Sequence, residues 1–123
     1  MRLDIFQVDA FSDKIFKGNP ACVIPLEKWL SDNILLKIAK ENAVAETAFF
    51  IKNEKEIYLR WFSPDLEMDL CGHATLATAY ILRSILKYSL DELTFNTLSG
   101  KLTVSFYDDI YYKFQKFFFF YHV

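Results

Sequence analysis

Glycine and proline are scarce in this sequence, which has three residues of each in a chain of 123. Because these residues punctuate loops and linkers, their scarcity argues against an interdomain linker, a low-complexity run or an internal repeat. A chain of this length is typical of a single domain that buries about two-thirds of its unfolded surface around one core. The composition, 53% hydrophobic and 24% charged, is that of a globular chain rather than a disordered one.

An excess of charge of one sign is also missing. Fourteen basic and sixteen acidic residues give a formal net charge of -2, and the lysines are scattered along the chain. We therefore expect no nucleic acid partner. No stretch approaches the ~20 apolar residues that span a bilayer, and charges interrupt residues 1–9 too early for a signal peptide. The sequence predicts a cytoplasmic protein with no membrane association.

Cysteine is rare, and the two cysteines, Cys22 and Cys71, do not have the spacing of metal ligands. Without a secretion signal, reduced thiols are expected rather than a disulfide or a zinc site. The acidic and hydroxyl side chains of residues 63–69 do not match a known metal-binding loop either, so we expect them to cap and to be solvated. No metal site is predicted.

The chain contains one strongly apolar helical segment, and it organises the rest. From Ala74 to Leu86 the apolar residues leave no continuous polar face, which predicts a helix in the middle of a core. Gly72 lets the backbone turn sharply into this helix. The free N–H groups of the first turn, beside His73 and Thr75, then form a positive pole that suits a small anion.

The remaining segments predict a sheet around that helix. Residues 31–42 form an amphipathic surface helix capped by Ser31, and residues 11–20 form a loop that ends in the turn Gly18-Asn19-Pro20. Alternating and β-branched patterns predict about seven short strands. These strands cover residues 3–10, 21–24, 47–51, 57–62, 91–97, 101–107 and the segment that begins at 110–112. The expected fold is α+β, with a curved, mostly antiparallel sheet wrapped around the central buried helix.

Glu46 occupies the point where a loop enters a predicted strand, between apolar neighbours. Taken alone, a glutamate at such a place is more often a solvated carboxylate than a catalytic one, because a buried unpaired carboxylate is costly. Both interpretations remain open from the residue alone.

Four separated segments resemble the PhzF-type phenazine biosynthesis proteins. They are residues 9–11 with 16–21, residues 46–49, residues 60–64, and residues 69–77, which read Asp-Leu-Cys-Gly-His-Ala-Thr-Leu-Ala. The resemblance covers Met1 to about Tyr112. This family is similar in fold to diaminopimelate epimerase, in which two related domains each wrap a sheet around a central helix and the active site lies between the domains.

The resemblance implies an isomerase that transfers a proton by general acid–base catalysis, with no cofactor and no metal, on a small carboxylate-bearing substrate. Glu46 matches the proton-transferring glutamate of the family. Gly72 and His73 match the pair that contacts substrate at the start of the central helix, where Ala74 and Thr75 complete the expected substrate-binding turn. Related epimerases use a pair of thiols, one from each domain. Cys71 has no suitable partner here, so it is not assigned a catalytic role.

The chain also departs from the family. We expect residues 1–112 to form the N-terminal domain and residues 113–123 to form an aromatic tail outside the family pattern, with four consecutive phenylalanines. The hypothesis is a truncated or frame-shifted product. The alternative function is therefore a non-catalytic remnant or self-associating domain that lacks the second half of the active site. A homodimer is expected, with aggregation as the competing outcome.

Overall fold

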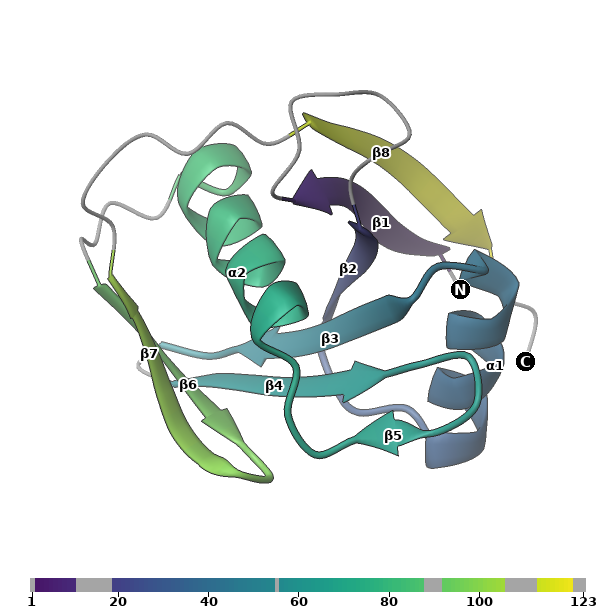
Figure 1. The fold of residues 1–123 in the computed structure, drawn as a ribbon, viewed down its shortest axis with the longest axis horizontal. Coiled ribbons are helices and arrows are strands. Elements are labelled where there is room, and N and C mark those ends of the chain that lie inside the picture. The colour runs from purple at the N-terminus through teal and green to yellow at the C-terminus, as the bar shows by residue number, and fades with distance from the viewer. Residues whose placement is uncertain (1, 11–18, 55, 88–91, 106–112, 121–123) are drawn as a thin grey trace.

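The computed structural model describes residues 2–10, 19–54, 56–87, 92–105 and 113–120 (Figure 1). Its helices are α1 (Asp32–Asn42), α2 (Gly72–Tyr80) and the π-helical turn η1 (Ile81–Ile85) that continues α2. Its strands are β1 (Arg2–Ala10), β2 (Asn19–Leu26), β3 (Glu46–Lys52), β4 (Ile57–Phe62), β5 (Glu67–Met68), β6 (Glu92–Thr97), β7 (Gly100–Ser105) and β8 (Lys113–Phe120). No helix in these described ranges is both long and apolar enough to cross a membrane.

The strands form one mixed sheet in the order β7-β6-β4-β3-β2-β1-β8, with β5 paired to β4. All the strand pairs are antiparallel except β2–β3 and β4–β6. Parallel neighbours need a crossover connection, which α1 supplies between β2 and β3, and which α2 with η1 supplies between β4 and β6. The expected α+β architecture with a mostly antiparallel sheet is confirmed.

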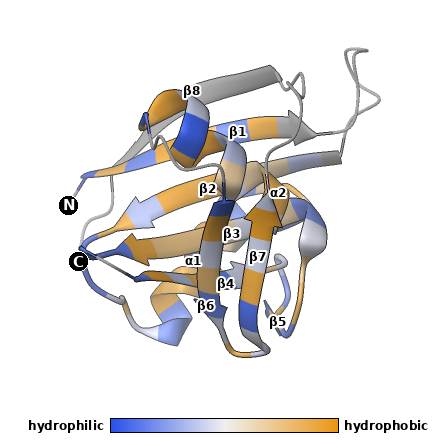
Figure 2. Cartoon of the chain, turned by 90° about the vertical axis from the view of Figure 1, so that its left-hand side faces the viewer, coloured by the Kyte–Doolittle hydropathy of each residue, from blue (hydrophilic) through white to orange (hydrophobic). Residues whose placement is uncertain are grey.

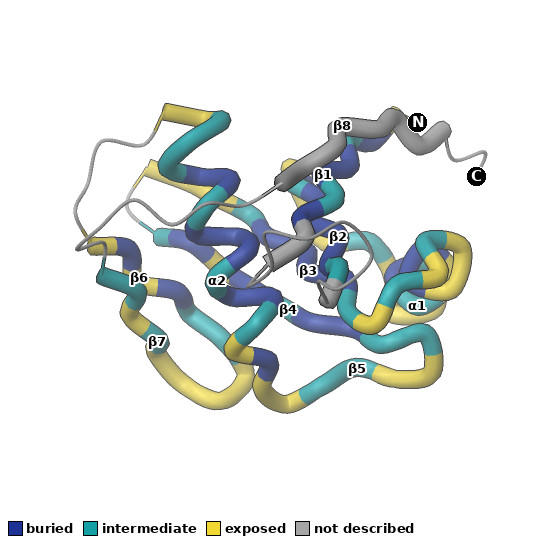
Figure 3. The backbone as a smooth tube through the Cα atoms, turned by 45° about the horizontal axis from the view of Figure 1, so that its top comes forward, coloured by how far each residue is buried: buried dark blue, intermediate teal, exposed yellow. Residues whose placement is uncertain are grey.

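The two helices cover opposite faces of the sheet, as the alternation of side chains along each strand requires. Phe6, Val23 and Trp61 pack in the cluster that contains α2, whereas Ile5 and Ile24 pack in the cluster that contains α1. The hydrophobic residues of the central strands therefore meet a helix on each side (Figure 2). Buried residues run along β3, β4 and α2, whereas the turn between β6 and β7 is exposed (Figure 3).

The predicted role of each helix is confirmed. In α1 only Leu35, Ile38 and Ala39 are buried, as expected for a surface helix. The Ser31 side chain caps it by accepting from the Ile34 amide at 3.4 Å. In contrast, α2 buries residues on most of its circumference, among them Ala74, Thr75, Ala77, Thr78 and Ala79.

Three local expectations are wrong. Asn19 and Pro20 pair with β1 as the first residues of β2, so the strand begins two residues before the predicted start at Ala21. The segment before α2 contains the short strand β5, which is held by β4. Gly72 was expected to let the backbone turn sharply into α2, but its φ is not positive; among the glycines in the described part of the chain, only Gly100 has a positive φ, of 98°.

Several expectations concern residues outside the described ranges. The predicted loop at residues 11–18 and the predicted strand start at residues 110–112 belong to this group. The segment expected to be a tail contributes β8, whose backbone pairs with β1 in antiparallel register from Arg2–Phe120 to Asp9–Lys113. The division of the chain at Tyr112 remains a prediction.

Candidate active site

Glu46 is the first residue of β3 and lies opposite Ala21 of β2 in the parallel register. The residue is half-buried, and its Oε2 atom is buried with no hydrogen-bond partner among the described residues. Leaving a buried acceptor unsatisfied is costly, by about 1–3 kcal/mol or more for a charged group. Such an atom in a folded protein needs an explanation, and a bound ligand or a transferable proton is one.

The second element of the site is the N-terminus of α2. Cys71 is the N-cap with extended backbone (φ -144°, ψ 99°), and its Sγ accepts from the Ala74 amide at 3.5 Å. The Thr75 amide donates to the Cys71 carbonyl at 3.1 Å. Gly72 is the first residue of α2 and is exposed, and the first amides of a helix have no acceptor within the helix itself. The positive end of the helix therefore opens at Gly72, where a small anion can approach.

Gly72 is open on its outer side. A Cβ atom added there would meet nothing within 4 Å. The backbone at this position does not require glycine. The consequence of the missing side chain is instead open space beside the first amide of α2. His73 follows as a half-buried residue in the same turn.

The charge of Glu46 acts on the Cys71 thiol, so the start of β3 and the N-terminus of α2 are close enough to interact electrostatically. Burial raises the pKa of the Cys71 thiol, and the negative charge of Glu46 raises it further. The amides of Ala74 and His73 act in the opposite direction by donating to the sulfur. Sequence reasoning left Cys71 out of the site; its place immediately before the helical Gly72 is the signal that could have identified it as the cap.

Ala74 and Thr75 lie deeper than the other expected site residues. Both are buried, and the Thr75 hydroxyl has two partners in the core. It accepts from the Trp61 indole N–H at 3.1 Å and donates to the Cys71 carbonyl at 2.7 Å. The substrate-binding roles assigned to this turn remain predictions, and the structure places the Thr75 side chain between α2 and β4.

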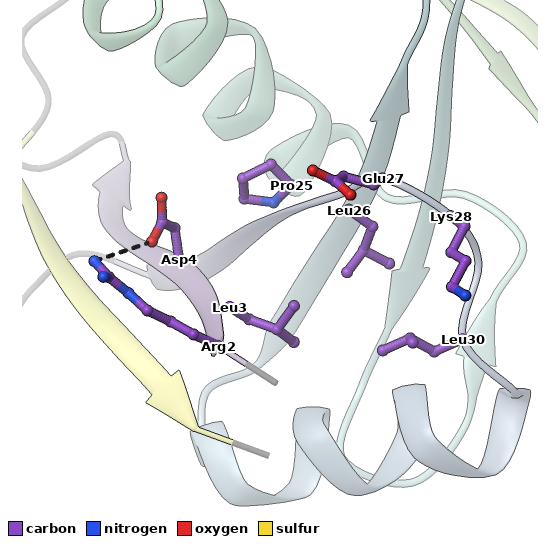
Figure 4. A pocket seen from close by; sticks show the side chains of 8 residues that line it. All are labelled: Arg2, Leu3, Asp4, Pro25, Leu26, Glu27, Lys28 and Leu30. Carbon is purple, nitrogen blue, oxygen red and sulfur yellow. Dashed lines mark ion pairs between the residues drawn. The ribbon is translucent and has the colours of Figure 1, made fainter. Parts of the chain in front are cut away.

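Two cavities lie elsewhere in the molecule. One, of about 450 Å³, is formed where β1 begins and β2 ends (Figure 4). It is lined by Arg2, Leu3, Asp4, Pro25, Leu26, Glu27, Lys28 and Leu30. The other, of about 240 Å³, lies beside Arg60 and Tyr58. Neither is lined by Glu46 or His73. The larger cavity has two cationic and two carboxylate side chains in its lining, so its charge favours neither an anionic nor a cationic ligand.

The candidate site is placed instead by the buried Glu46 Oε2 atom without a partner and by the N-terminus of α2. Groups of three or more His, Cys, Asp or Glu side chains suited to a metal do not occur in the described ranges.

The sequence matches the profile of the PhzC-PhzF family, described as phenazine biosynthesis-like protein, over residues 8–116. An uncharacterised isomerase of Pseudomonas aeruginosa is 54% identical over 104 residues, which cover 85% of this chain and 40% of that protein. A phenazine biosynthesis-like domain-containing protein of Bos taurus is 46% identical over 110 residues, covering 83% of this chain and 38% of the relative. The chain thus spans about 40% of the length of the curated relatives it matches.

Solved structures give the same picture. A crystal structure of a protein of the phenazine biosynthesis protein PhzF family from Enterococcus faecalis superimposes with a TM-score of 0.81 at 48% identity. The match covers 85% of this chain and 40% of that one. A predicted epimerase of Pseudomonas aeruginosa shares the fold at 22% identity, with a TM-score of 0.65.

Proposed function

The chain belongs to the PhzC-PhzF family of phenazine biosynthesis-like proteins, and on that premise we propose that it acts as an isomerase by general acid–base proton transfer. Glu46 is the acid–base residue in this proposal, and no cofactor or metal takes part. The observation that supports it best is the buried Glu46 Oε2 atom, which has no hydrogen-bond partner among the described residues. A carboxylate oxygen that is held away from water without a partner can accept a proton from a substrate carbon and return it.

The proposed substrate is a small molecule with a carboxylate. The open space at Gly72 lets such a group reach the first amide of α2, where the partial positive charge of the helix favours an anion. His73, in the same turn, adds a hydrogen bond or a charge to the bound substrate. With the carboxylate at α2, the reacting carbon comes near the first residue of β3, where Glu46 is located.

Solvent deuterium incorporation tests the proposal. A panel of small carboxylic acids, each with an acidic C–H bond, is incubated in D2O with the wild-type chain and followed by proton NMR. The Glu46→Gln variant removes the acid–base group and keeps the size of the side chain. We expect the exchange rate to fall by about 10²-fold or more. The matched control is Glu41→Gln, which neutralises an exposed carboxylate at the end of α1 and leaves exchange unchanged.

A non-catalytic, self-associating domain is the second candidate function. It is supported by large hydrophobic side chains that remain exposed, among them Trp29, Tyr58, Leu66, Leu70, Leu86 and Leu98. Exposed apolar surface favours association between copies of a chain, and a homodimer is the simplest product. Exchange no faster in the wild type than in Glu46→Gln, together with a dimer in sedimentation velocity, supports this second candidate over the first.

A further inference from the structure

One buried hydrogen bond ties the start of α2 to the sheet, and a second joins the same threonine to the N-cap of α2. The Trp61 indole Nε1–H donates to Thr75 Oγ1 at 3.1 Å, and the Thr75 hydroxyl donates to the Cys71 carbonyl at 2.7 Å. Trp61 is 1% exposed and Thr75 is 4% exposed, so water does not compete for these bonds. The connection runs from Trp61, the last residue but one of β4, to the N-cap of α2.

The same tryptophan is linked to Glu46 through the sheet. Trp61 is the Cα partner of Ala48, which lies two residues beyond Glu46 in β3. A continuous chain of contacts therefore connects Glu46 with Cys71. Glu46 and Ala48 belong to β3, and Ala48 pairs with Trp61 of β4. The Trp61 indole bonds Thr75, which in turn bonds Cys71. Cys71 is in turn the electrostatic neighbour of Glu46.

We propose that Trp61 and Thr75 are positioning residues of the Glu46 site, which fix the first turn of α2, with Gly72 and His73, relative to the carboxylate. This inference rests on the proposed function, because the turn is positioned for that chemistry. It adds Trp61 to the site and gives the Thr75 side chain, which is bonded to Trp61 and Cys71, a positioning role in place of the substrate contact expected from the sequence. Without the bonds, the turn loses its side-chain link to β4, although the Cys71 Sγ cap and the bond from the Thr75 amide to the Cys71 carbonyl remain. A displacement of about 1 Å in such a turn is enough to impair an acid–base site.

Thr78 provides a matched control in the same helix. Its side chain is fully buried, and its hydroxyl donates to the Ala74 carbonyl of its own helix at 2.8 Å. Thr75→Val and Thr78→Val therefore remove the same group from the same kind of environment. Only Thr75→Val also removes the acceptor of the Trp61 indole.

The first test is amide hydrogen exchange by NMR, which needs no substrate. In Thr75→Val we expect the His73 and Ala74 amides to exchange about fivefold faster relative to those of Ile81 and Leu82, the effect of one lost buried hydrogen bond. Thr78→Val should leave that ratio at its wild-type value, and Thr75→Ser should restore it. An equal change in Thr75→Val and Thr78→Val overturns the proposal, because the hydroxyls would then contribute only to general stability.

The indole signal supplies a second measurement on the same samples. The chain has two tryptophans, and Trp29, which is 36% exposed, serves as the reference for a tryptophan at the surface. The Trp61 indole N–H should exchange slowly in the wild type and in Thr75→Ser, and faster in Thr75→Val. Trp61→Phe, which removes the donor, should reproduce the amide pattern of Thr75→Val. If Trp61→Phe leaves the His73 and Ala74 amides unchanged, the link through the indole is refuted.

Deuterium incorporation separates this inference from the proposed function. Where the wild-type chain shows exchange on a substrate, Thr75→Val should lower kcat, and Thr75→Ser should recover it, with Thr78→Val near wild type. If Glu46→Gln exchanges as fast as the wild type, the proposed function fails, but the amide and indole measurements still decide whether the two residues fix the turn.

Discussion

Arg60 and Glu67 form a two-pronged ion pair between neighbouring strands. Arg60 Nε lies 2.7 Å from Glu67 Oε2, and Arg60 Nη2 lies 2.8 Å from Glu67 Oε1. Nη2 also bonds Asp32 Oδ1 at 2.8 Å, at the start of α1. The guanidinium carbon lies 5.1 Å from the ring centre of Trp29 and 5.4 Å from that of Phe62. One side chain therefore joins β4, β5 and α1.

The first prediction is that Arg60→Lys destabilises the fold, although it keeps the charge. A lysine cannot make the parallel pair of bonds or lie flat on the two aromatic rings. The side chain of Arg60 is 17% exposed and that of Glu67 is 25% exposed, so the pair is only partly screened by water. We expect the free energy of unfolding, measured by urea denaturation, to fall by about 1.5–3 kcal/mol. In a double-mutant cycle, Glu67→Gln should lower the free energy of unfolding much more in the wild type than in the Arg60→Lys variant. An equal loss in the two backgrounds would contradict the prediction.

Gly72→Ala should separate folding from ligand binding. A Cβ atom there meets nothing within 4 Å, and alanine favours helix more than glycine does. The free energy of unfolding should therefore stay the same or rise by up to about 1 kcal/mol. The methyl group takes up part of the open space at Gly72, so a carboxylate bound there should be held at least about tenfold more weakly. Titration calorimetry with a substrate found in the deuterium assay measures this, and unchanged affinity would place the carboxylate elsewhere.

Cysteine ionisation should make the protein less stable at high pH. Burial raises the pKa of the Cys22 thiol from 9.0 to about 12. The folded chain therefore keeps a proton that the unfolded chain releases above pH 9, so this contribution to stability is complete below pH 9 and is lost as the pH rises toward 12. Burial and Glu46 raise the pKa of Cys71 as well, which adds to the same slope.

Urea unfolding at a series of pH values tests this expectation. Cys22→Ala should show a shallower fall in the free energy of unfolding between pH 9 and 12 than the wild type, whatever its stability at neutral pH. Cys71→Ala measures the separate share of the second thiol. A fall in Cys22→Ala as steep as in the wild type would show that Cys22 does not contribute.

Cys71→Ser tests whether the thiol has a role beyond capping. Serine is a better N-cap than most residues, so its hydroxyl should replace the sulfur as acceptor for the Ala74 amide and keep the free energy of unfolding within about 1 kcal/mol of the wild type. Cys71→Ala removes the cap and should lose about 1 kcal/mol. Since Glu46 is the proposed acid–base group, deuterium incorporation should survive in Cys71→Ser. Its loss there would assign the thiol a chemical role.

The sequence was most informative where a single residue or a short segment determines the local structure. Ser31 predicted the start of α1, and the apolar stretch after Gly72 predicted the buried helix, because capping and burial patterns act over a single turn or face. The strands β6 and β7 followed from the pattern of residues 91–97 and 101–107, and the structure pairs them as antiparallel neighbours.

Contacts between distant residues could not be predicted in the same way. The parallel pairing of Ala21 with Glu46, the strand β5 and the bond from Trp61 to Thr75 depend on the whole sheet being assembled. For the candidate site, Glu46 and the turn at Gly72 were identified through a family resemblance, whereas the orphaned Glu46 Oε2 atom and the capping by Cys71 required the structure.

The register between β1 and β8 has a consequence for the order of events in folding. Arg2 and Phe120 are partners although they lie near opposite ends of the sequence, so their pairing closes a loop of almost the whole chain. Loop closure of this length carries a larger entropic penalty than the local hairpins, and we expect β8 to dock last. Until then β1 is paired with β2 on one side only, and its other edge is open to pairing with another molecule. Docking within one chain is independent of concentration and pairing between chains is not, so the yield of monomer on refolding should fall as the protein concentration rises.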